Sequence, residues 1–424
     1  MKNIIKISVV TTLLLSSLNA QEVEPEAKKH RIHSVRQAVD NIAKIDDKEV
    51  FIVDDFRNMF KDGKVSGRIR MMYAANGVDE PNADDTYATA FGGIIKYELA
   101  NYNGFNAAAA VYTSHDITAA SGSKTHHNPE LSSSSGSYTE MAEAYINYKY
   151  KGLNLRAGRQ KLETPLADTD DIRMIQNSFE AYVGTYSYAD VEFMIGYLQS
   201  WQGADADLDR AWHSIADHGT SFSGISYRDS VEFNLWYYNI SDLTNALYSD
   251  VGLEYPFNDD ILLHLGAQIL NEEELADSQV AATIYGGLFE FIYHDIGFNI
   301  AFNHSLKREG KQSFSGTGGG TMYTSMDTMI IDVLADDREV FAYVAGISYS
   351  IDYFNFLYAH GDFVGKENSN GVKEHVLEHN MGFSYEVNEE FLISAIYAIS
   401  EDKESDVKTV YDFDRVQFMV NYNF

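Results

Sequence analysis

The sequence predicts an all-β protein, a transmembrane antiparallel β-barrel of about 18 strands. One observation behind this prediction is composition: the 424 residues include 29 Tyr, 24 Phe and 30 Gly but only 5 Pro, which suits long strands with aromatic girdles. A second is that no run of 18 or more apolar residues follows the N-terminus, which excludes a helical membrane protein. The third is a period-2 alternation of apolar and polar residues that recurs to the end of the chain.

Residues 1–20 have the pattern of a secretory signal peptide. Lys2 and Lys6 form a positive start, residues 7–15 form a short apolar core, and residues 16–20 (SSLNA) form a cleavage site, although Leu18 is not the small residue usually found three before the cut. The core is too short to span a membrane, so we expect the segment to be removed. Residues 21–62 do not alternate. We expect them to form a short, partly helical periplasmic segment that caps the inner rim of the barrel.

Residues 63–424 carry the alternation and are predicted to form the transmembrane barrel. In the last strand one face holds Val416, Phe418, Val420, Tyr422 and Phe424, and the other holds Arg415, Gln417, Asn421 and Asn423. The apolar face carries almost no charge, as in a barrel with lipid outside and a polar lumen inside. Because the strand ends on Phe424, with Tyr422 on the same face, it looks like the signal read by the outer-membrane assembly machinery.

The connections between strands alternate in length. Eight short turns are expected near residues 101–104, 150–152, 188–190, 228–230, 257–260, 294–295, 352–354 and 388–390. Nine longer polar segments lie near 75–84, 118–137, 163–176, 202–219, 240–243, 271–278, 306–338, 363–372 and 401–409. Seventeen connections join eighteen strands, the even count that is typical of a bacterial barrel with both ends in the periplasm.

Charge and cysteine content exclude several classes of function. The chain carries 32 basic and 63 acidic residues, a net charge of −31, and loss of Lys2 and Lys6 with the signal peptide would make it −33. Such an excess argues against nucleic acid as a partner and suits the attraction of cations. The absence of cysteine excludes disulfide scaffolds, thiol catalysis and cysteine-bound metals.

Three stretches resemble a known family. Residues 158–182 read GRQKLETPLADTDDIRMIQNSFEAY, and the supporting stretches are NMFKDGKVSGRIR at 58–70 and YINYKYKG at 145–152. Together they resemble the OprD-like outer-membrane porins, most of all the branch with the major outer-membrane porins of Campylobacter. The resemblance implies an eighteen-stranded channel whose third outer loop, here about 163–176, folds inward, and a ladder of basic residues that faces acidic loop residues. The family archetype takes up carboxylated substrates, but the loops here are much more acidic, so that specificity does not carry over.

Parity and this resemblance together select the residues of a pore constriction. On the wall we expect Arg68 and Arg70 on the first strand, Glu143, Glu180 after the third loop, and Arg156 and Arg159. The last two have opposite parity, so both can face the lumen only if a bulge at Gly158 breaks the alternation. From the third loop we expect Asp168, Asp170, Asp171 and Arg173. Opposed basic and acidic walls would orient dipolar solutes and screen them by charge, although such charges can also simply pair with one another.

No cofactor is expected, and the metal candidates are weak. Asp205, Asp207 and Asp209 alternate as oxygen ligands for calcium would. An EF-hand needs Gly at the sixth position and Glu at the twelfth, where this chain has Arg210 and Ala216. A solvated acidic loop is therefore the preferred interpretation, with calcium left open. The glycine-rich stretch at 313–320 is expected to be a flexible loop rather than a phosphate site.

The function predicted from these observations is passive diffusion of small hydrophilic solutes and ions across the bacterial outer membrane, with a preference for cations. The alternative is a surface adhesin or receptor that uses the loops at 118–137 and 306–338. An outer-membrane phospholipase is not favoured, since His379 has no serine at a matching depth. The partners expected are outer-membrane lipid and lipopolysaccharide, the assembly machinery, and small polar solutes and ions. A homotrimer is left open beside a monomer.

Overall fold

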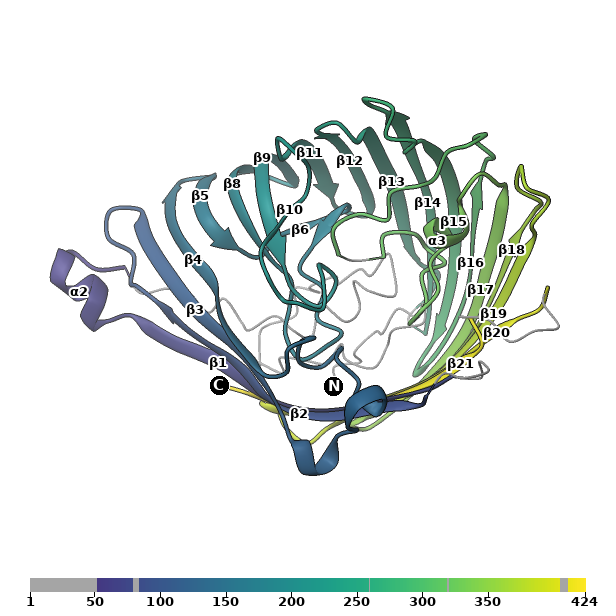
Figure 1. Cartoon of the computed structure of the whole chain (residues 1–424). Helices are drawn as coiled ribbons and strands as arrows, with labels where there is room; N and C mark the ends of the chain where they lie inside the picture. The colour runs from purple at the N-terminus through teal and green to yellow at the C-terminus, as the bar shows by residue number, and fades with distance from the viewer. Residues whose placement is uncertain (1–51, 79–83, 259, 319, 405–410) are drawn as a thin grey trace.

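The computed structural model describes residues 52–78, 84–258, 260–318, 320–404 and 411–424. The predicted signal peptide and residues 21–51 lie outside this part of the chain. The described residues form a ring of antiparallel strands around a lumen (Figure 1). Within them, eighteen strands make the wall: β1 (Lys64–Val78), β2 (Thr86–Glu98), β3 (Phe105–Asp116), β4 (Tyr138–Tyr150), β5 (Leu153–Gln160), β8 (Ser178–Tyr188), β9 (Val191–Gln202), β11 (Thr220–Arg228), β12 (Val231–Ile240), β13 (Thr244–Pro256), β14 (Ile261–Glu274), β15 (Ala282–Tyr293), β16 (Ile296–Ser305), β17 (Val340–Ile351), β18 (Phe354–Gly365), β19 (Glu374–Glu386), β20 (Phe391–Asp402) and β21 (Phe413–Asn423).

Each wall strand pairs with its neighbours in sequence, and β1 pairs with both β2 and β21, which closes the barrel. The closure includes the last residue, because Gly67 N–H donates to the Phe424 carbonyl and Phe424 N–H donates to the Gly67 carbonyl, both at 3.0 Å. All main-chain groups at this seam are therefore paired as a barrel requires. The predicted eighteen-stranded antiparallel barrel is confirmed.

All eight short turns join the strands predicted for them. Several consist of two residues, and the first of the two has a left-handed φ: 51° at Lys151, 48° at Ala189, 50° at His294 and 51° at Asp352. Turns of this kind match the right-handed twist of the flanking strands, whereas the common turn types would splay them. The short turns therefore gather at one end of the barrel, and the long loops at the other.

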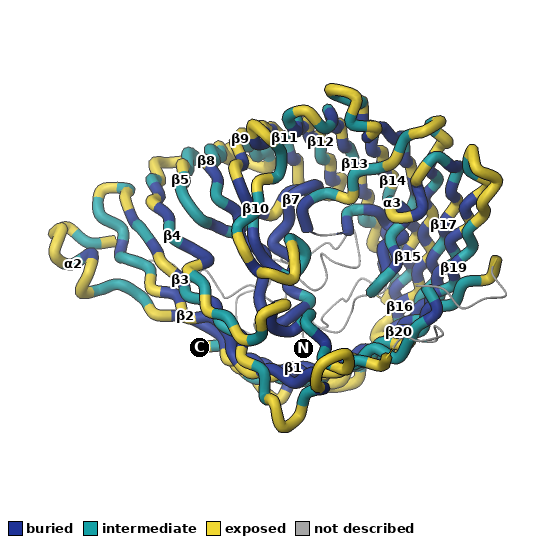
Figure 2. Tube along the Cα trace, in the orientation of Figure 1, coloured by how far each residue is buried: buried dark blue, intermediate teal, exposed yellow. Residues whose placement is uncertain are grey.

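Burial alternates along the strands as the period-2 pattern predicts (Figure 2). In β18 the exposed side chains are those of Phe354, Phe356 and Tyr358, while Asn355 and Leu357 between them are buried. Large apolar and aromatic residues thus face outward around the ring, and the inner face combines polar and small residues with buried aromatic ones such as Trp236 and Phe363. The outer surface is one that only an apolar solvent such as lipid would satisfy.

The described residues also form two short α-helices, one at the short-turn end of the barrel and one inside the ring. Helix α2 (Phe56–Lys61) begins after Asp55, whose side chain accepts a hydrogen bond from Arg57 N–H at 2.7 Å. It lies at the short-turn end, where Ala100 N–H donates to the Met59 carbonyl at 3.0 Å. Helix α3 (Ile331–Leu334) lies inside the ring in Figure 1. Among the described residues, no helix is both long enough and apolar enough to cross a membrane.

Candidate functional site

The site is built first from the seam between β1 and β21. Arg68 lies opposite Asn423 and Arg70 lies opposite Asn421 across the ladder. Arg68 Nε donates to the Asn423 side-chain oxygen at 3.1 Å, and Arg70 Nε donates to that of Asn421 at 2.6 Å. Residues two apart on a strand point to the same face roughly 7 Å from one another. The two asparagines therefore hold both guanidinium groups on the lumen face, with their terminal nitrogens directed away from the wall.

Loop 3 (residues 161–177) brings Asp171 onto these two arginines. Arg70 donates to the two carboxylate oxygens of Asp171 from Nη1 at 2.8 Å and from Nη2 at 2.9 Å, and Arg68 Nη1 donates to Oδ2. Arg70 also donates to the main-chain carbonyl of Arg173. All of these side chains are buried. Burial by itself would raise the pKa of Asp171, but Arg68 and Arg70 outweigh it and hold that pKa below its usual value.

A second ion-pair group joins three loops to the same wall. Glu130, from loop 2 (residues 117–137), lies 3.2 Å from Arg173 Nε and 3.0 Å from Arg415 Nη2. Arg415 in turn lies 3.5 Å from Asp327 of loop 7 (residues 306–339). Burial would raise the pKa of Glu130, but Arg173 and then Arg415 lower it to about 2. Loops 2, 3 and 7 therefore meet through charge pairs beside β21.

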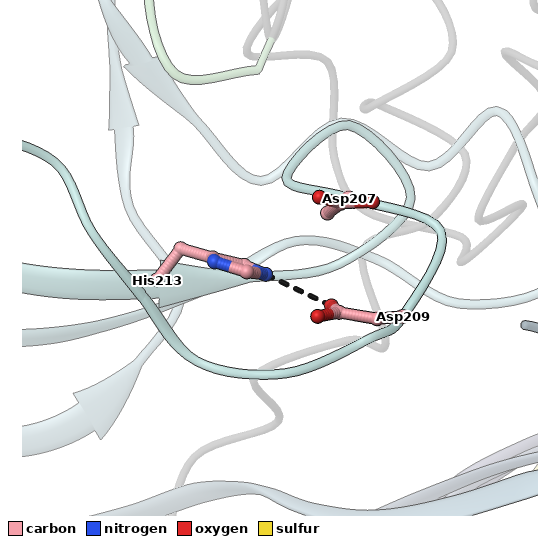
Figure 3. A group of neighbouring side chains, drawn as sticks. All are labelled: Asp207, Asp209 and His213. Carbon is pink, nitrogen blue, oxygen red and sulfur yellow. Dashed lines mark hydrogen bonds and ion pairs between the residues drawn. The ribbon is translucent and has the colours of Figure 1, made fainter. Parts of the chain in front are cut away.

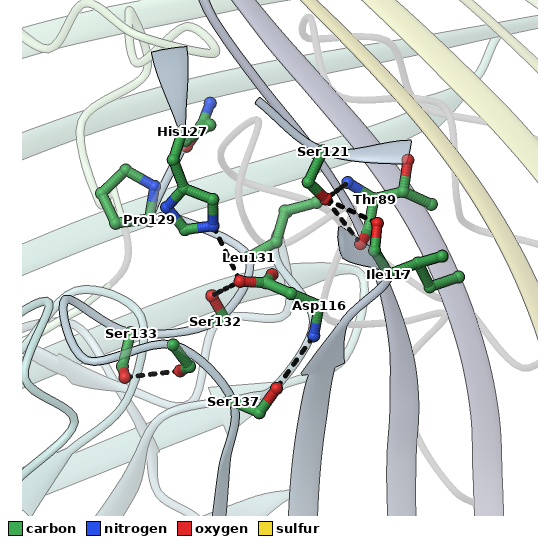
Figure 4. A network of polar contacts seen from close by, with 12 residues as sticks. Thr89, Asp116, Ile117, Ser121, His127, Pro129, Leu131, Ser132, Ser133 and Ser137 are labelled. Carbon is green, nitrogen blue, oxygen red and sulfur yellow. Dashed lines mark hydrogen bonds and ion pairs between the residues drawn. The ribbon is translucent and has the colours of Figure 1, made fainter. Parts of the chain in front are cut away.

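Loop 2 is held in shape by its own polar contacts, which Figure 4 shows. The Asp116 carboxylate is 2.7 Å from His127 Nε2 and accepts from Ser132 Oγ at 3.0 Å. Ser114 Oγ donates to the Leu131 carbonyl at 2.6 Å, so the middle of the loop is fixed to β3. His127 therefore helps to hold Asp116 in place within the loop.

Arg210 of loop 4 (residues 203–219) fixes the position of Glu130 from the other side. Its side chain is buried and donates to main-chain carbonyls of loop 2, at 2.6 Å to Ser132 and at 2.8 Å to Glu130. It also donates to the Gly203 carbonyl at 3.0 Å. One arginine therefore ties loops 2 and 4 together above the seam.

Glu143 forms a third charged group on the wall. Its carboxylate accepts a hydrogen bond from Tyr112 at 2.7 Å and lies 3.3 Å from Lys96 Nζ. Lys161, at the start of loop 3, is half-buried, and desolvation lowers its pKa despite the attraction of Glu143. The predicted wall residue Glu143 thus pairs with Lys96 of β2.

Arg156 and Arg159 lie on opposite faces of β5. The register of β5 with β4 and with β8 is continuous through Gly158, so the bulge expected there does not form. Arg156 stays on the lumen face, its guanidinium 4.4 Å from the ring centre of Tyr145. The expectation that Arg159 faces the lumen is wrong for this register, which places it on the face of Leu155 and Ala157.

Glu180 is a second correction on the wall. It pairs directly with Arg159 in the β5–β8 ladder and so shares its outward face near the loop end of the barrel. There Glu180 accepts a hydrogen bond from Ser200 Oγ at 3.2 Å, and the Arg159 guanidinium stacks 4.4 Å from the ring centre of Trp212. The ladder of β8 with β9 shifts register next to this residue, between Glu180 and Ala181, and the ladder of β3 with β4 shifts between Ala110 and Val111.

The remaining predicted residues of loop 3 lie where that loop meets loop 7. The two-residue strands β6 (Glu163–Thr164) and β7 (Ala167–Asp168) form a small hairpin. Asp168 N–H donates to the Thr317 carbonyl at 3.1 Å, and Thr317 N–H donates to the Leu166 carbonyl at 2.9 Å. Asp168 and Asp170 are both buried. Residues 313–318, within the stretch expected to be a flexible loop, are therefore bonded to loop 3 inside the lumen.

Loop 7 is fixed to the wall at several points. Glu378 of β19 accepts from Thr328 Oγ1 at 2.6 Å and from Met329 N–H at 2.7 Å. Glu272 of β14 accepts from Phe314 N–H at 3.1 Å. The ring of Tyr323 lies over Gly266, where a Cβ atom would come within 2.8 Å of the Tyr323 oxygen. Loop 7 thus occupies the lumen together with loop 3.

The wall opposite β1 is acidic. Strand β13 is the tenth of the eighteen in ring order, and Figure 1 shows β12 and β13 across the lumen from β1 and β2. Buried carboxylates on this side include those of Glu232, Asp250 and Glu290, besides Glu272 of β14, which binds loop 7. Asp250 accepts from Asn234 at 2.9 Å, and Glu290 is 2.7 Å from His264 Nδ1. Basic and acidic groups therefore face each other across the ring.

The calcium candidate in loop 4 is rearranged relative to the prediction. Asp205 accepts a hydrogen bond from Asn177 at 2.8 Å and does not lie with Asp207 and Asp209. Asp207 and Asp209 instead come together with His213, and their ligand atoms lie within 4.8 Å of one another (Figure 3). Asp209 already bonds to His213 Nε2 at 2.8 Å. A histidine beside two exposed carboxylates is a different donor set from the all-oxygen shell that calcium prefers.

Sequence analysis missed several members of the site. Asn421, Asn423 and Arg415 were on the predicted polar face of the last strand. Pairing that strand with the first would have placed the two asparagines beside Arg68 and Arg70, and Arg415 beside Asn76. Glu130 carried no such signal, because its position depends on the shape of a long loop. The same holds for Asp327 in loop 7.

Comparison with known proteins agrees with this geometry. No family model matches the sequence, and no curated protein does so. Solved structures match over most of the chain. OccAB4 of Acinetobacter baumannii has a TM-score of 0.74 and 15% identity over 85% of this chain and 98% of its own. OpdK of Pseudomonas aeruginosa, solved with vanillate, has a TM-score of 0.74 and 14% identity over 86% and 99%. A BenF-like porin of Pseudomonas fluorescens Pf-5 has a TM-score of 0.74 and 12% identity over 86% and 99%. The chain therefore has the fold of the OprD and Occ outer-membrane porins.

Proposed function

We propose that this protein is a channel of the bacterial outer membrane for passive diffusion of small hydrophilic solutes and ions, with a preference for cations. The observation that supports the proposal is a charged contact inside a closed barrel, where Asp171 of loop 3 pairs with Arg68 and Arg70. A lipid-facing outer surface and a charged, loop-narrowed lumen are what a diffusion channel needs. The fold shared with known porins supports the same function.

The preference for cations rests on the balance of charge around the lumen. The basic groups near β1 are matched by carboxylates of loops 2 and 3, whereas the β12–β15 wall adds Glu232, Asp250 and Glu290. Confined water between low-dielectric walls weakens screening, so these charges act strongly on passing ions. The arginines keep the result a preference rather than an exclusion of anions.

The test is the reversal potential of the purified full-length chain in a planar bilayer under a salt gradient. We expect a cation-selective potential, and we expect the triple variant Asp168→Asn, Asp170→Asn and Asp171→Asn to move it toward zero. The charge-matched control replaces Asp207, Asp209 and Asp217, exposed carboxylates of loop 4, by asparagine. Absence of conductance would contradict the channel, and an anion preference would contradict the charge argument. A triple variant that behaves like the control would contradict the place of loop 3 in the constriction.

The alternative function, a surface receptor, depends on the loops at 118–137 and 306–338. Part of each is buried inside the barrel, since Leu131, Tyr323 and Ile331 are fully buried, while residues 118–120 and 123–126 are exposed. The burial of loop 7 favours the channel as the primary function.

A further inference from the structure

Helix α2 carries an apolar face that no described part of the chain covers. Phe56 and Phe60 are four residues apart, so they lie on one side of the helix, and they remain 59% and 54% exposed. Their rings contact each other, with centres 5.6 Å apart. Ile52, shortly before the helix, is 83% exposed. Large apolar side chains that are exposed together mark a surface that meets another apolar surface.

The helix is fixed to the rim of the barrel, so this face has a defined direction. The Met59 side chain is buried, and its carbonyl accepts from Ala100 N–H at 3.0 Å. The Phe56 ring meets the Tyr102 ring edge to face, with centres 6.1 Å apart. Figure 1 shows α2 at the edge of the ring rather than across the lumen. The helix therefore lies beside the β2–β3 turn and leaves the channel open.

The exposed face of α2 is continuous with the outer surface of the barrel. Tyr97 is exposed on the outward face of β2, and its hydroxyl donates to the Phe60 carbonyl. Phe105, at the start of β3, is also exposed on the outside, and its ring centre lies 4.6 Å from that of Tyr148. Outward aromatic residues at a strand end are those that meet the boundary between headgroups and acyl chains. Phe60 thus lies next to residues that contact lipid at the periplasmic boundary of the membrane.

We propose that α2 is an interfacial anchor, and that Ile52, Phe56 and Phe60 insert into the phospholipid leaflet on the periplasmic side of the membrane. Amphipathic helices bind in this way with their apolar face about 5–10 Å into the boundary between headgroups and acyl chains. Lipid is the occupant that the position favours, because the face continues a surface that already faces lipid. This role is separate from the passage of solutes, since α2 lies outside the lumen.

The first experiment uses tryptophan as a depth probe in the full-length protein. Phe56→Trp and Phe60→Trp are reconstituted in phosphatidylcholine vesicles with or without bromine on the acyl chains, and the signal of the three native tryptophans is subtracted with the wild type. Lys61→Trp is the matched control, because Lys61 is exposed and lies roughly 100° around the helix from Phe60. We expect bromine to quench the Phe56 and Phe60 probes at least about twofold more than the Lys61 probe.

Equal quenching at the three positions would overturn the proposal. Blue-shifted emission from the Phe56 and Phe60 probes without quenching by bromine would also overturn it, because it would show that protein covers the face, either a second copy or the part of this chain that precedes residue 52. Heat-modifiable migration shows which variants have formed a barrel.

A second experiment needs no tryptophan variant. A phosphatidylcholine with a photoreactive diazirine on its acyl chain should label the peptide that contains residues 52–61 of the wild type. The double variant Phe56→Ser and Phe60→Ser should lose that label and keep its single-channel conductance. Labelled wall strands beside an unlabelled 52–61 peptide in the wild type would overturn the anchor while leaving the channel proposal standing. Loss of conductance in the wild type would have the opposite meaning, so the two proposals fail separately.

Discussion

Asn234 and Leu235 are consecutive residues in β12 that face opposite solvents. Leu235 is exposed on the outer surface, and Asn234 donates to Asp250 across the ladder at 2.9 Å on the lumen side. Leu235 is the fifth of the ten residues of the strand, so it lies near the middle of the membrane. Leu235→Arg should lower the free energy of unfolding by roughly 2–4 kcal/mol, as charged residues do at the bilayer midplane.

Asn234→Arg is the matched control for this change, and reversible unfolding in lipid vesicles is the measurement. The new guanidinium would face Asp250 in a water-filled lumen, so we expect little loss of stability. Equal losses for the two variants would show that the outward and inward faces of β12 are assigned the wrong way round.

Glu130 gives a pH prediction at the residue scale. Its pKa is about 2 in the folded protein, lowered from the ordinary 4.5 by Arg173 and Arg415 against the effect of burial. A lowered pKa means that the pairing stabilises the fold fully above the ordinary pKa and is lost as the pH falls toward 2. Glu130 therefore stays ionised from pH 7 to about pH 4, and over this range it should cause no change in single-channel conductance. Near pH 2 its protonation should loosen loops 2 and 3, and the conductance of single channels should fluctuate.

Glu130→Gln should bring that unsteady behaviour to pH 7, because the neutral amide no longer balances Arg173 and Arg415. Noise in single-channel recordings is the measurement, with Glu140→Gln on the neighbouring strand as a control outside this group. Recordings of Glu130→Gln as steady as those of the wild type would contradict the role of this ion pair in holding loops 2 and 3.

Parity placed Arg68, Arg70 and Arg156 correctly on the inner face, because a continuous strand leaves no freedom in which side a residue faces. The same rule places Arg159 outward together with its ladder partner Glu180, and the prediction erred where it brought these two residues inward. Register shifts occur instead at β3–β4 and β8–β9. Bulges have no strong local sequence signal, which is why the residue that departs from the pattern could not be chosen correctly.

At the scale of elements, loop 7 depends on close contact between Tyr323 and β14. Gly266 leaves room for the ring, since a Cβ atom there would lie 2.8 Å from the Tyr323 oxygen and 3.3 Å from the Leu288 Cβ. Gly266→Val should therefore push Tyr323 away, displace loop 7 and raise single-channel conductance.

The control is Gly184→Val on β8, where the nearest atoms are the ends of exposed side chains, Leu155 at 3.2 Å and Ile195 at 3.7 Å. That substitution should leave conductance unchanged. If Gly266→Val conducts like the wild type and loop 7 resists proteolysis as before, the contact does not hold the loop.

The final strand is an element whose last residue has a defined partner. Phe424 exchanges both main-chain hydrogen bonds with Gly67, and its ring stacks on Tyr422 with centres 6.3 Å apart. Deleting Phe424 removes two hydrogen bonds at the closing seam and an aromatic group from the outer surface. We expect the amount of heat-modifiable barrel in the outer membrane to fall. The Phe424→Tyr variant should assemble in normal amounts, and the Phe424→Ser variant should not. Normal outer-membrane amounts of the protein that lacks Phe424 would contradict an assembly role for this residue.

Strands and short turns were predictable from the pattern, and the resemblance implied the inward fold of loop 3, but the inward path of loop 7 was not predicted. Alternation and two-residue turns are local properties, and each can be read from about ten residues. The path of loop 7 depends instead on distant partners such as Glu272, Glu378 and Leu166. A glycine-rich stretch looks flexible in isolation, yet the same small residues allow Thr317 to lie against loop 3.

At the scale of the whole molecule, charge is divided between two sides of the ring. Near β1, Asp171 and Glu130 are shared among Arg68, Arg70, Arg173 and Arg415. Across the lumen, carboxylates lie on β12, β13 and β15. Asp250 is hydrogen-bonded to the amide of Asn234, and Glu290 to the imidazole of His264. The potential felt by a passing ion should therefore depend more on the far wall than on loop 3, whose charges are largely balanced where they stand.

This division predicts which substitutions control selectivity. Replacing Glu232 by Gln, Asp250 by Asn and Glu290 by Gln keeps the shape of each side chain and removes three charges, so it should shift the reversal potential further toward anions than the loop 3 triple variant does. The wild-type preference itself should shrink as salt rises, because the Debye length falls from about 10 Å at 0.1 M to about 3 Å at 1 M. Heat-modifiable migration would show that the variant still forms a barrel. If the far-wall variant keeps its cation preference while the loop 3 variant loses it, then loop 3 and not the far wall sets the selectivity, and the balance of charge inferred for the β1 side is wrong.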